Sequence, residues 1–398
     1  MFDVIALAII FVGLVCIRLD ISFEISNKGT SKSELLFTQT LMKNIETLSK
    51  ESLYLSVDDW KNKNWLENDE TLSETTDEVK ENTTDMNQVH MTVTGDVLFS
   101  TSPLNKYDSG NGITSILSSD LIDKMESADI AMINLEFPFS TRGTQMEDKQ
   151  YTFRADPSRC SILKEMGVDI VSLANNHTLD FGTEALLDTI MTLNKNNILS
   201  VGAGADLEAA KKPSVVAVNG RNIAILGASR VIPVTDWNAT KYSPGVFTTY
   251  DPTLLIEEIK TAKQSNDLVM VYVHWGIEKK EYPEEYQRTM AKQYIDAGAD
   301  LVIGSHPHVL QGIEYYNGKP IVYSLGNFIF GHTIDRTVLL DVTIDEQNSC
   351  NLRLIPCETK DAYTHTITSG EKIQEFFTYY ESISYGIKVD KYGNVIEE

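Results

Sequence analysis

The sequence has few basic residues for its length. Lysine and arginine together number 34, against 57 aspartate and glutamate residues, which gives a net charge of −23 and a pI near 4.7. A surface that binds nucleic acid by neutralising its phosphates needs an excess of basic residues. The composition therefore argues against a broad nucleic-acid interface, and we expect no nucleic acid among the partners.

Cysteine is also scarce, with 4 residues in 398. Cys350 and Cys357 fall on one expected strand, where the extended chain separates them by about 23 Å. Bridged Cα atoms lie within about 7 Å of each other, so these two residues are not expected to pair. The cysteines form no disulfide framework and do not indicate a redox compartment.

Long apolar runs are confined to the N-terminus, where residues 4–17 are apolar without interruption. This run is shorter than the roughly 20 residues of a spanning helix, although Leu19, Ile21 and Phe23 could extend it. A basic segment before it and a small-residue cleavage site after it are both missing. We predict a membrane or signal anchor over residues 1–24, and a buried helix of the folded domain is the alternative.

A polar segment follows the apolar run. Residues 67–85 contain 8 acids and 1 lysine with almost no apolar side chain, which is typical of a solvated linker. We predict an acidic linker over residues 25–88 that is partly helical, with an amphipathic helix within residues 33–64.

From residue 89 onward, strand-like and helix-like patterns alternate. Strands are predicted at residues 89–94, 130–135, 169–174, 199–201, 268–273 and 301–303. Helices are predicted at residues 113–125, 156–167, 183–193, 207–211, 253–263, 283–297 and 373–383. Asn-Gly pairs at 219–220 and 317–318 predict hairpins, and residues 338–344 with 351–355 predict a third. We expect an α/β fold of two packed sheets with helices outside, over residues 89–360, followed by a C-terminal helix and tail over 361–398.

Two histidines follow the strand at residues 301–303. The strand stops at Gly304, and His306 and His308 come next with Pro307 between them. Proline fixes its own backbone and favours an extended neighbour, so the segment cannot continue as a helix. Ligands of open α/β sheets bind at the carboxyl ends of strands, although surface or core histidines at this spacing are common.

Polar groups also follow the other predicted strands, and each of them alone could be a cap or a core hydrogen-bonding group. They are Asp96, Asn134 and Glu136, Asn175 to His177 with Asp180, and His274. Carboxylate, amide and imidazole ligands without thiolate suit Mn, Fe or Zn in a site that is not a structural zinc site. The set exceeds the needs of one four-coordinate ion, so we predict two divalent ions. Such a pair activates water and stabilises an in-line displacement at phosphorus.

These motifs, in this order, resemble those of the CapA-type poly-γ-glutamate capsule synthesis family, which is itself similar to calcineurin-like metallophosphoesterases. The resemblance covers about residues 90–335 and also includes His274-Trp275-Gly276 with Glu278, residues 305–309 and residues 323–328. It implies a four-layer α/β/β/α metallophosphoesterase-like sandwich with a metal centre at the strand ends. It also implies a membrane-anchored protein whose main domain lies outside the cytoplasm and takes part in making or exporting poly-γ-glutamate.

The resemblance further implies a role for each residue. The metal ligands would be Asp96, Glu136, Asn176, His274, His306 and His308, with Glu136 in the place of the bridging carboxylate. His177 would stabilise or protonate the leaving oxygen, and Asp180 would orient it. The sequence departs from the phosphoesterase Asp-x-His motif at Leu98, which removes one ligand of the first metal.

The loop after the second strand adds a substrate-binding hypothesis. Arg154 is expected to bind phosphate or carboxylate through both of its terminal nitrogens, with a surface ion pair as the alternative. Trp275 is expected to pack against the site wall. Asn327 and Tyr323 either support the ligands or simply pack in the core.

Three functions remain open at this point. The first is a metal-dependent hydrolase or transferase acting on a phosphate ester or a γ-glutamyl polymer. The second is a non-catalytic accessory subunit that binds the polymer or other capsule synthesis subunits at the membrane. The third is a cytoplasmic phosphoesterase with a membrane tether, which the positive-inside rule favours because Arg18, Lys28 and Lys32 follow the apolar run.

Overall fold

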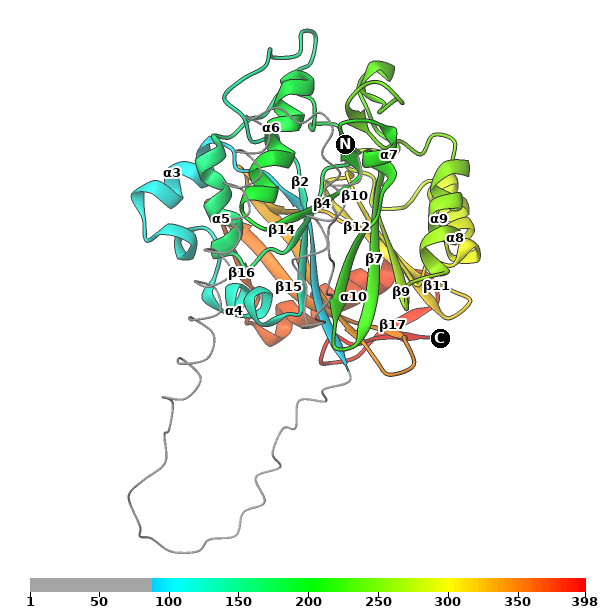
Figure 1. The fold of residues 1–398 in the computed structure, drawn as a ribbon. Coiled ribbons are helices and arrows are strands. Elements are labelled where there is room, and N and C mark those ends of the chain that lie inside the picture. The colour runs from blue at the N-terminus through cyan, green and yellow to red at the C-terminus, as the bar shows by residue number, and fades with distance from the viewer. Residues whose placement is uncertain (1–87) are drawn as a thin grey trace, which may run out of the picture. The chain divides into compact units, whose positions relative to one another are not determined.

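Two β-sheets form the centre of the computed structural model, which describes residues 88–398 (Figure 1). The first sheet has the strand order β16-β15-β14-β1-β2-β3-β4, and β13 pairs with the end of β1. Its strands are β1 (Val89–Val97), β2 (Ile130–Leu135), β3 (Ile170–Ser172), β4 (Leu199–Val201), β13 (Asn327–Ile329), β14 (Ile334–Ile344), β15 (Cys350–Lys360) and β16 (Tyr363–Thr366). The second sheet has the order β11-β12-β10-β9-β7-β6. Its strands are β6 (Ser214–Val218), β7 (Arg221–Ser229), β9 (Leu268–His274), β10 (Leu301–Ser305), β11 (Leu310–Tyr316) and β12 (Lys319–Leu325).

The predictions for the N-terminal segment lie outside the described residues. These are the anchor over 1–24 and the helix within 33–64, together with nearly all of the linker over 25–88.

Both sheets combine parallel with antiparallel strands. In the first sheet β1, β2, β3 and β4 run parallel, and β14, β15 and β16 continue it as an antiparallel edge. In the second sheet β7, β9, β10 and β12 run parallel, and β6 and β11 flank them as antiparallel edges. The carboxyl ends of parallel strands all lie at the same end of the sheet, so the residues that follow these strands are brought together.

Alternating side chains divide the molecule into layers. Val89, Met91 and Val93 of β1 face the apolar cluster between the two sheets, which also holds Met270 and Ile303 of the second sheet. Successive side chains of a strand point to opposite faces, and the other face of each sheet packs against helices. The order is therefore helices, sheet, sheet, helices, and the predicted α/β fold of two packed sheets is confirmed.

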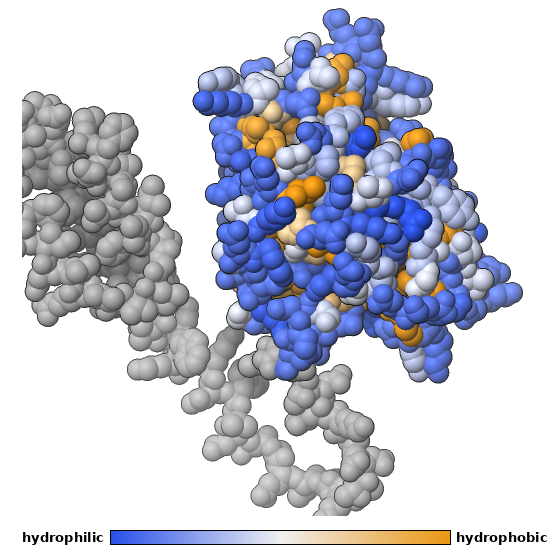
Figure 2. Space-filling view, turned by 90° about the vertical axis from the view of Figure 1, so that its right-hand side faces the viewer, coloured by the Kyte–Doolittle hydropathy of each residue, from blue (hydrophilic) through white to orange (hydrophobic). Residues whose placement is uncertain are grey.

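Helices cover the outer face of each sheet, as Figure 1 shows. The apolar cluster beside the first sheet includes side chains from α4 (Ser119–Ser127), α5 (Cys160–Glu165) and α6 (Gly182–Lys195). The cluster beside the second sheet includes side chains from α8 (Thr253–Lys263) and α9 (Glu285–Ala297). The space-filling view onto the side of α8 and α9 is largely hydrophilic with separate hydrophobic spots (Figure 2).

The remaining elements are short or lie at the ends of the sheets. They are α3 (Thr101–Ser109), α7 (Leu207–Lys211), α10 (Gly370–Ser382), β5 (Ala203–Gly204), β8 (Gly245–Val246), β17 (Ile387–Val389), β18 (Val395–Glu397) and the 3₁₀ turns Gly112–Ser115, Pro157–Arg159 and Thr235–Trp237. No helix within residues 88–398 has the length and apolarity needed to cross a membrane.

The single helix predicted at residues 113–125 is wrong, because the chain forms a 3₁₀ turn and then α4. Between them the backbone pairs with β16: Ser118 N donates to Thr364 O (3.0 Å), and Thr364 N donates to Ile116 O (2.9 Å). This tertiary pairing replaces the helical hydrogen bonds that the apolar pattern favours. Helix α3 was not predicted.

Local turn chemistry is confirmed at the two Asn-Gly pairs. Asn219 and Gly220 have φ of 48° and 75°, and Asn317 and Gly318 have φ of 52° and 68°. Left-handed backbone at both central positions is what a type I′ hairpin turn requires. The helix start at Asp156 is also confirmed, since its carboxylate accepts from Ser158 N at 2.9 Å.

The C-terminal segment packs against the sheets. Strand β16 pairs with β15, and Phe376, Phe377 and Tyr380 of α10 belong to the cluster between the sheets. Cys350 and Cys357 both lie on β15, as expected. Within residues 88–398 the cysteines are free and buried.

One largely buried carboxylate ties α9 to the second sheet. Glu314 of β11 accepts from Arg288 (2.9 Å) and Tyr323 (2.7 Å) and lies 2.9 Å from the Lys292 ammonium. Burial by itself would raise the pKa of Glu314, but the hydrogen bonds from Arg288, Lys292 and Tyr323 lower it to about 2. A native pKa below the ordinary value stabilises the fold while the carboxylate is ionised.

Replacing Glu314 by glutamine should therefore destabilise the fold by about 2 kcal/mol at pH 7, because Arg288 and Lys292 lose their acid partner. The stabilisation by Glu314 is complete above its ordinary pKa of about 4.5 and is lost as the pH falls toward about 2. Urea unfolding midpoints of both proteins should thus converge on acidification. Glu257→Gln, at an exposed position of α8, is the control and should have little effect at either pH.

Candidate metal centre

Strand β1 carries the first residue of the candidate metal site, Asp96. Asp96 is fully buried near the end of β1, and its Oδ1 accepts from Asn134 Nδ2 at 2.8 Å. Glycine precedes it because a Cβ on Gly95 would lie 1.8 Å from Gly326 O. This close approach lets β13 pair with β1 with Asp96 opposite Asn327.

The strands of the second sheet bring three histidines to the same place. His274 ends β9, and its Nδ1 lies 2.9 Å from Ser305 Oγ of β10. His306 and His308 follow β10 with positive φ values of 99° and 56°. The imidazole rings of His274 and His306 are 4.7 Å apart, and those of His306 and His308 are 5.8 Å apart. The double-histidine turn is thus a strained backbone that aims both rings toward the first sheet.

Asp96, Glu136 and His308 form a group that could hold a metal ion. One ligand atom from each lies within 4.8 Å of the others. His308 Nδ1 is 3.3 Å from Asp96 Oδ2, and its Nε2 is 3.8 Å from Glu136 Oε1. His274 Nε2 is 3.9 Å from the same Glu136 oxygen.

The donors of this group fit a divalent cation. Glu136 is fully buried, yet neither of its carboxylate oxygens has a hydrogen-bond partner in the described part of the chain, and His306 Nδ1 is also buried without one. Such orphaned acceptors are costly in a folded protein and call for a missing partner. Oxygen and imidazole donors without thiolate suit Mn, Fe or Zn.

The electrostatics agree with a missing positive charge. Burial raises the pKa of the Glu136 carboxyl well above its ordinary value, and the nearby Asp96 adds to this effect. Burial alone would lower the pKa of His308, but Glu136 and Asp96 raise it to about 10. The two carboxylates thus favour a cation between them, and a divalent ion provides one.

The other imidazoles are suited to act as neutral ligands. Burial lowers the pKa of His274, with further contributions from His306 and His308. Burial also lowers the pKa of His306, to about 3. A metal-binding histidine must be unprotonated on the nitrogen that it offers, so these two rings are ready to bind.

Amides from two loops complete the surroundings. Asn176 Oδ1 lies 2.8 Å from His274 Nε2, so the predicted ligand Asn176 is in contact with the histidine set. Asn327 Oδ1 lies 2.7 Å from His308 Nδ1, and this contact orients the His308 ring. Asn175 instead braces the loop, since its Nδ2 donates to Leu135 O at 2.8 Å.

The predicted pair His177 and Asp180 lies beside this group. His177 Nδ1 is 2.7 Å from Asp180 Oδ2, and because a carboxylate only accepts, the ring nitrogen is assigned as the donor. Burial lowers the pKa of His177 despite the neighbouring acid. The centre of the Phe153 ring lies 4.5 Å from that of the His177 ring. Asp180 thus holds the imidazole at Nδ1, and Phe153 packs against the ring.

Sequence reasoning missed Lys149. Its ammonium contacts Asp180 Oδ1 and Asn176 O, and it lies 3.1 Å from His177 Nδ1. The residue stands in an irregular loop with no periodic pattern. The only signal that could have found it is its closeness in sequence to Arg154, the predicted substrate-binding residue.

Arg154 is not brought to the metal group. Its guanidinium lies 4.0 Å from the centre of the Phe181 ring and donates to Arg142 O at 3.1 Å. Trp275 does not line either cleft beside the metal group, as a site-wall residue would; it is buried beside Tyr294 and Tyr323 in the apolar cluster between the second sheet and its helices. Tyr323 donates to Glu314 at 2.7 Å and has a core role.

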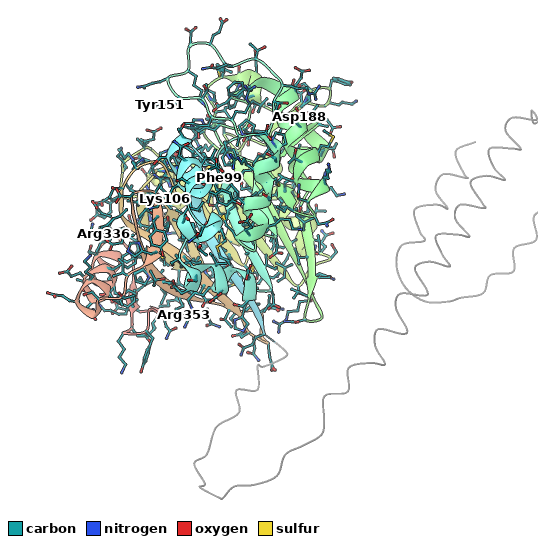
Figure 3. All side chains as sticks on the ribbon, turned by 90° about the vertical axis from the view of Figure 1, so that its left-hand side faces the viewer. Phe99, Lys106, Tyr151, Asp188, Arg336 and Arg353 are labelled. Carbon is teal, nitrogen blue, oxygen red and sulfur yellow. The ribbon has the colours of Figure 1, made fainter. Side chains whose placement is uncertain are left out.

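Two clefts open beside the metal group. A cleft of about 500 Å³ is lined by residues that include Leu98, Tyr151, Phe153 and His177. A second of about 310 Å³ is lined by residues that include Arg336 and Tyr379. His308, Lys279 and His332 line both clefts. Tyr151 and Arg336 lie above and below on the same side of the molecule (Figure 3).

Leu98 lies where the phosphoesterase motif would have a histidine. Its side chain is 2% exposed and lines the larger cleft. A leucine offers no ligand atom, so the site lacks a donor at this position.

The fold and the site define an α/β protein with a buried oxygen and imidazole ligand group at the strand ends. Residues 90–332 match the family described as bacterial capsule synthesis protein PGA_cap, so the chain belongs to this family. It is 39% identical over 213 residues to the PGA biosynthesis protein CapA of Bacillus subtilis, covering 53% of this chain and 56% of that protein. It is 31% identical over 293 residues to the capsule biosynthesis protein CapA of Bacillus anthracis, covering 70% of each chain. The chain thus spans little more than half the length of the B. subtilis relative.

The solved structures that match this chain have lower sequence identity to it than the two CapA proteins. A putative 5′-nucleotidase from Staphylococcus aureus in complex with α-ketoglutarate matches with a TM-score of 0.44 and 15% identity, covering 74% of this chain and 58% of that one. Sulfate thiohydrolase SoxB from Thermus thermophilus in complex with glycerol matches with a TM-score of 0.41 and 12% identity, covering 74% and 60%.

Removing one member of the ligand group should release the metal. We expect the purified full chain to contain Mn, Fe or Zn, and His308→Ala to lose most of it. Asn327→Ala, which removes only the partner of His308, should weaken metal affinity by about 10- to 100-fold. Elemental analysis after exhaustive dialysis measures both effects.

His365→Ala is the matched control, because His365 lies on β16 beside Glu358, away from the ligand group. Equal metal content in the His308→Ala and His365→Ala variants would contradict the assignment.

Proposed function

We propose that the protein is a metal-dependent hydrolase of metallophosphoesterase type that acts in the synthesis or export of a poly-γ-glutamate capsule. Membership of the capsule synthesis family and similarity to two CapA proteins support the pathway. The observation that supports the hydrolase is the buried Glu136 carboxylate next to Asp96 and His308, which has no hydrogen-bond partner among residues 88–398.

Asp96, Glu136 and His308 would hold the metal, with Asn176, His274 and His306 as further ligands. Divalent ions at such a site supply positive charge that stabilises the oxygens of a displacement at phosphorus. The ligand set suits two ions, and Leu98 makes the first position the weaker one. Glu136 is fully buried, and the low dielectric around it strengthens the charge interactions inside the site.

His177 would act on the leaving oxygen. Water adds to phosphorus, the ester P–O bond breaks, and the protonated His177 ring gives a proton to the departing oxygen. The proton released by the attacking water restores the ring. The Nδ1 hydrogen bond to Asp180 orients the imidazole so that its Nε2 is available to the cleft that His177 lines.

The clefts would receive the substrate. Tyr151 and Phe153 provide an aromatic wall beside His177 in the larger cleft. Lys279 lines both clefts, and Arg336 adds positive charge in the smaller one, where Glu281 and Asp335 also lie. Basic groups of this kind suit a substrate with carboxylate or phosphate groups beyond the scissile bond. Arg154, which lies over Phe181, is the less favourably placed arginine for this role.

A non-catalytic accessory subunit that binds the γ-glutamyl polymer is the second candidate. Leu98 at a ligand position favours it, because a site short of one donor can keep its shape without turnover. A relative from Mycobacterium tuberculosis, 33% identical over 244 residues and covering 57% of this chain and 64% of that protein, is named a probable polyglutamine synthesis accessory protein.

The location of the domain is part of the proposal. The apolar residues 4–17 would anchor the chain in the cell membrane, with the domain outside the cytoplasm and beside other capsule synthesis subunits. Protease added to intact cells should then digest the domain. Protection of the domain in intact cells, with digestion after lysis, would place it in the cytoplasm instead.

Turnover should depend on His177. We expect the full chain to hydrolyse p-nitrophenyl phosphate and an alkyl phosphate with added Mn²⁺, Fe²⁺ or Zn²⁺, and His177→Ala to lower kcat for the alkyl phosphate by about 10²- to 10⁴-fold, because its leaving oxygen needs a proton. His365→Ala should keep its rate. No bound metal above background together with no metal-stimulated turnover in the wild type would exclude the hydrolase; bound metal without turnover would favour the accessory subunit.

A further inference from the structure

A largely buried lysine lies next to the His177–Asp180 pair. The Lys149 side chain is 12% exposed, and its ammonium contacts Asp180 Oδ1 and Asn176 O. The nitrogen also lies 3.1 Å from His177 Nδ1 and 5.0 Å from the centre of the Trp237 ring. Within residues 88–398, this ammonium thus donates to Asp180, a member of the pair, and to the backbone carbonyl of Asn176, a proposed ligand.

This placement is costly. Taking an ammonium out of water costs several kcal/mol unless it is fully paired, and burial lowers the pKa of Lys149. An apolar side chain would fill the space beside Trp237 without that cost. A buried charge beside a proposed proton donor is therefore more readily explained by its contacts than by packing.

Lys149 determines how Asp180 presents its two oxygens. The ammonium takes Oδ1, which leaves Oδ2 to His177 Nδ1 (2.7 Å) and to the backbone N of Phe153 (2.7 Å). With both oxygens engaged, the carboxylate plane cannot rotate. The His177 ring then has one orientation, with its face against Phe153.

The same contacts tie the loop of residues 140–154 to the site. Met146 N donates to Asp180 O at 2.8 Å, and Arg142 at the far end of the loop pairs with Asp188 of α6 at 2.6 Å. Tyr151 and Phe153, which follow Lys149, line the larger cleft with His177. Lys149 therefore connects the cleft wall with the proton-donating pair.

We infer that Lys149 is a positioning residue, which holds Asp180 and through it the His177 ring, and which keeps the aromatic wall of the cleft in place. The kinetic part of this inference rests on the proposed hydrolase function. The structural part does not, and the two parts have separate tests.

The kinetic test compares two leaving groups in the metal-loaded full chain. A nitrophenolate departs without being protonated, whereas an alkoxide must receive a proton as it departs. A misplaced His177 ring therefore lowers kcat more for the alkyl ester than for the nitrophenyl ester. We expect Lys149→Met to lower kcat for an alkyl phosphate at least about 10-fold more than for p-nitrophenyl phosphate, as His177→Ala does. Lys149→Arg should recover part of this loss. An equal loss for both esters, or none, would overturn a positioning role.

The structural test needs no turnover. The Phe153 amide donates to Asp180 Oδ2, so its hydrogen exchange reports whether the carboxylate is held. In the full chain, Lys149→Met should accelerate this exchange at least about 10-fold, and Lys149→Arg should accelerate it less. Lys195→Met, at an exposed position of α6, is the control and should leave it unchanged. Unchanged exchange in Lys149→Met would overturn the inference.

The two tests also separate this inference from the proposed function. A wild-type chain that hydrolyses neither ester would refute the hydrolase, and amide exchange alone would then decide whether Lys149 holds the pair. A hydrolase in which Lys149→Met behaves as the wild type in both tests would refute only the inference.

Discussion

The burial of Glu136 is the constraint on which the site depends. A carboxylate without hydrogen-bond partners inside a protein costs several kcal/mol, and this one is fully buried with no such partner in the part of the chain that the structure describes. Asp96 adds a second negative charge, and His308 alone cannot satisfy both acids. The histidines of the second sheet and the acids of the first thus lie close enough to hold a metal ion between them.

The two-sheet architecture explains how residues so distant in sequence meet. The first sheet supplies Asp96 and Glu136 from adjacent parallel strands, and the second supplies His274 and the turn at His306 and His308. Because the sheets pack face to face, their strand ends lie across from each other. Gly95 permits the close backbone contact that completes this arrangement around β13.

Much of this could be predicted from sequence, because strands have a short and regular pattern. Apolar runs ending in Asp96, Glu136, His274 and His306 identified both the strands and the residues at their ends. The Asn-Gly hairpins followed from backbone chemistry that is local to the turn. The break between the 3₁₀ turn and α4 could not be predicted, because its cause is pairing with β16 from far along the chain. Lys149 was missed because an irregular loop has no periodic pattern. As with the pairing to β16, only the folded structure shows the contact, here between the Lys149 ammonium and Asp180.

The central claim is that Asp96, Glu136 and His308 share a divalent ion. Anomalous diffraction from crystals of the protein grown with Mn²⁺ tests this most directly. The account predicts a strong anomalous peak within about 2.0–2.3 Å of ligand atoms of these three residues. No peak between them at saturating Mn²⁺, or a peak held by other side chains, would contradict it.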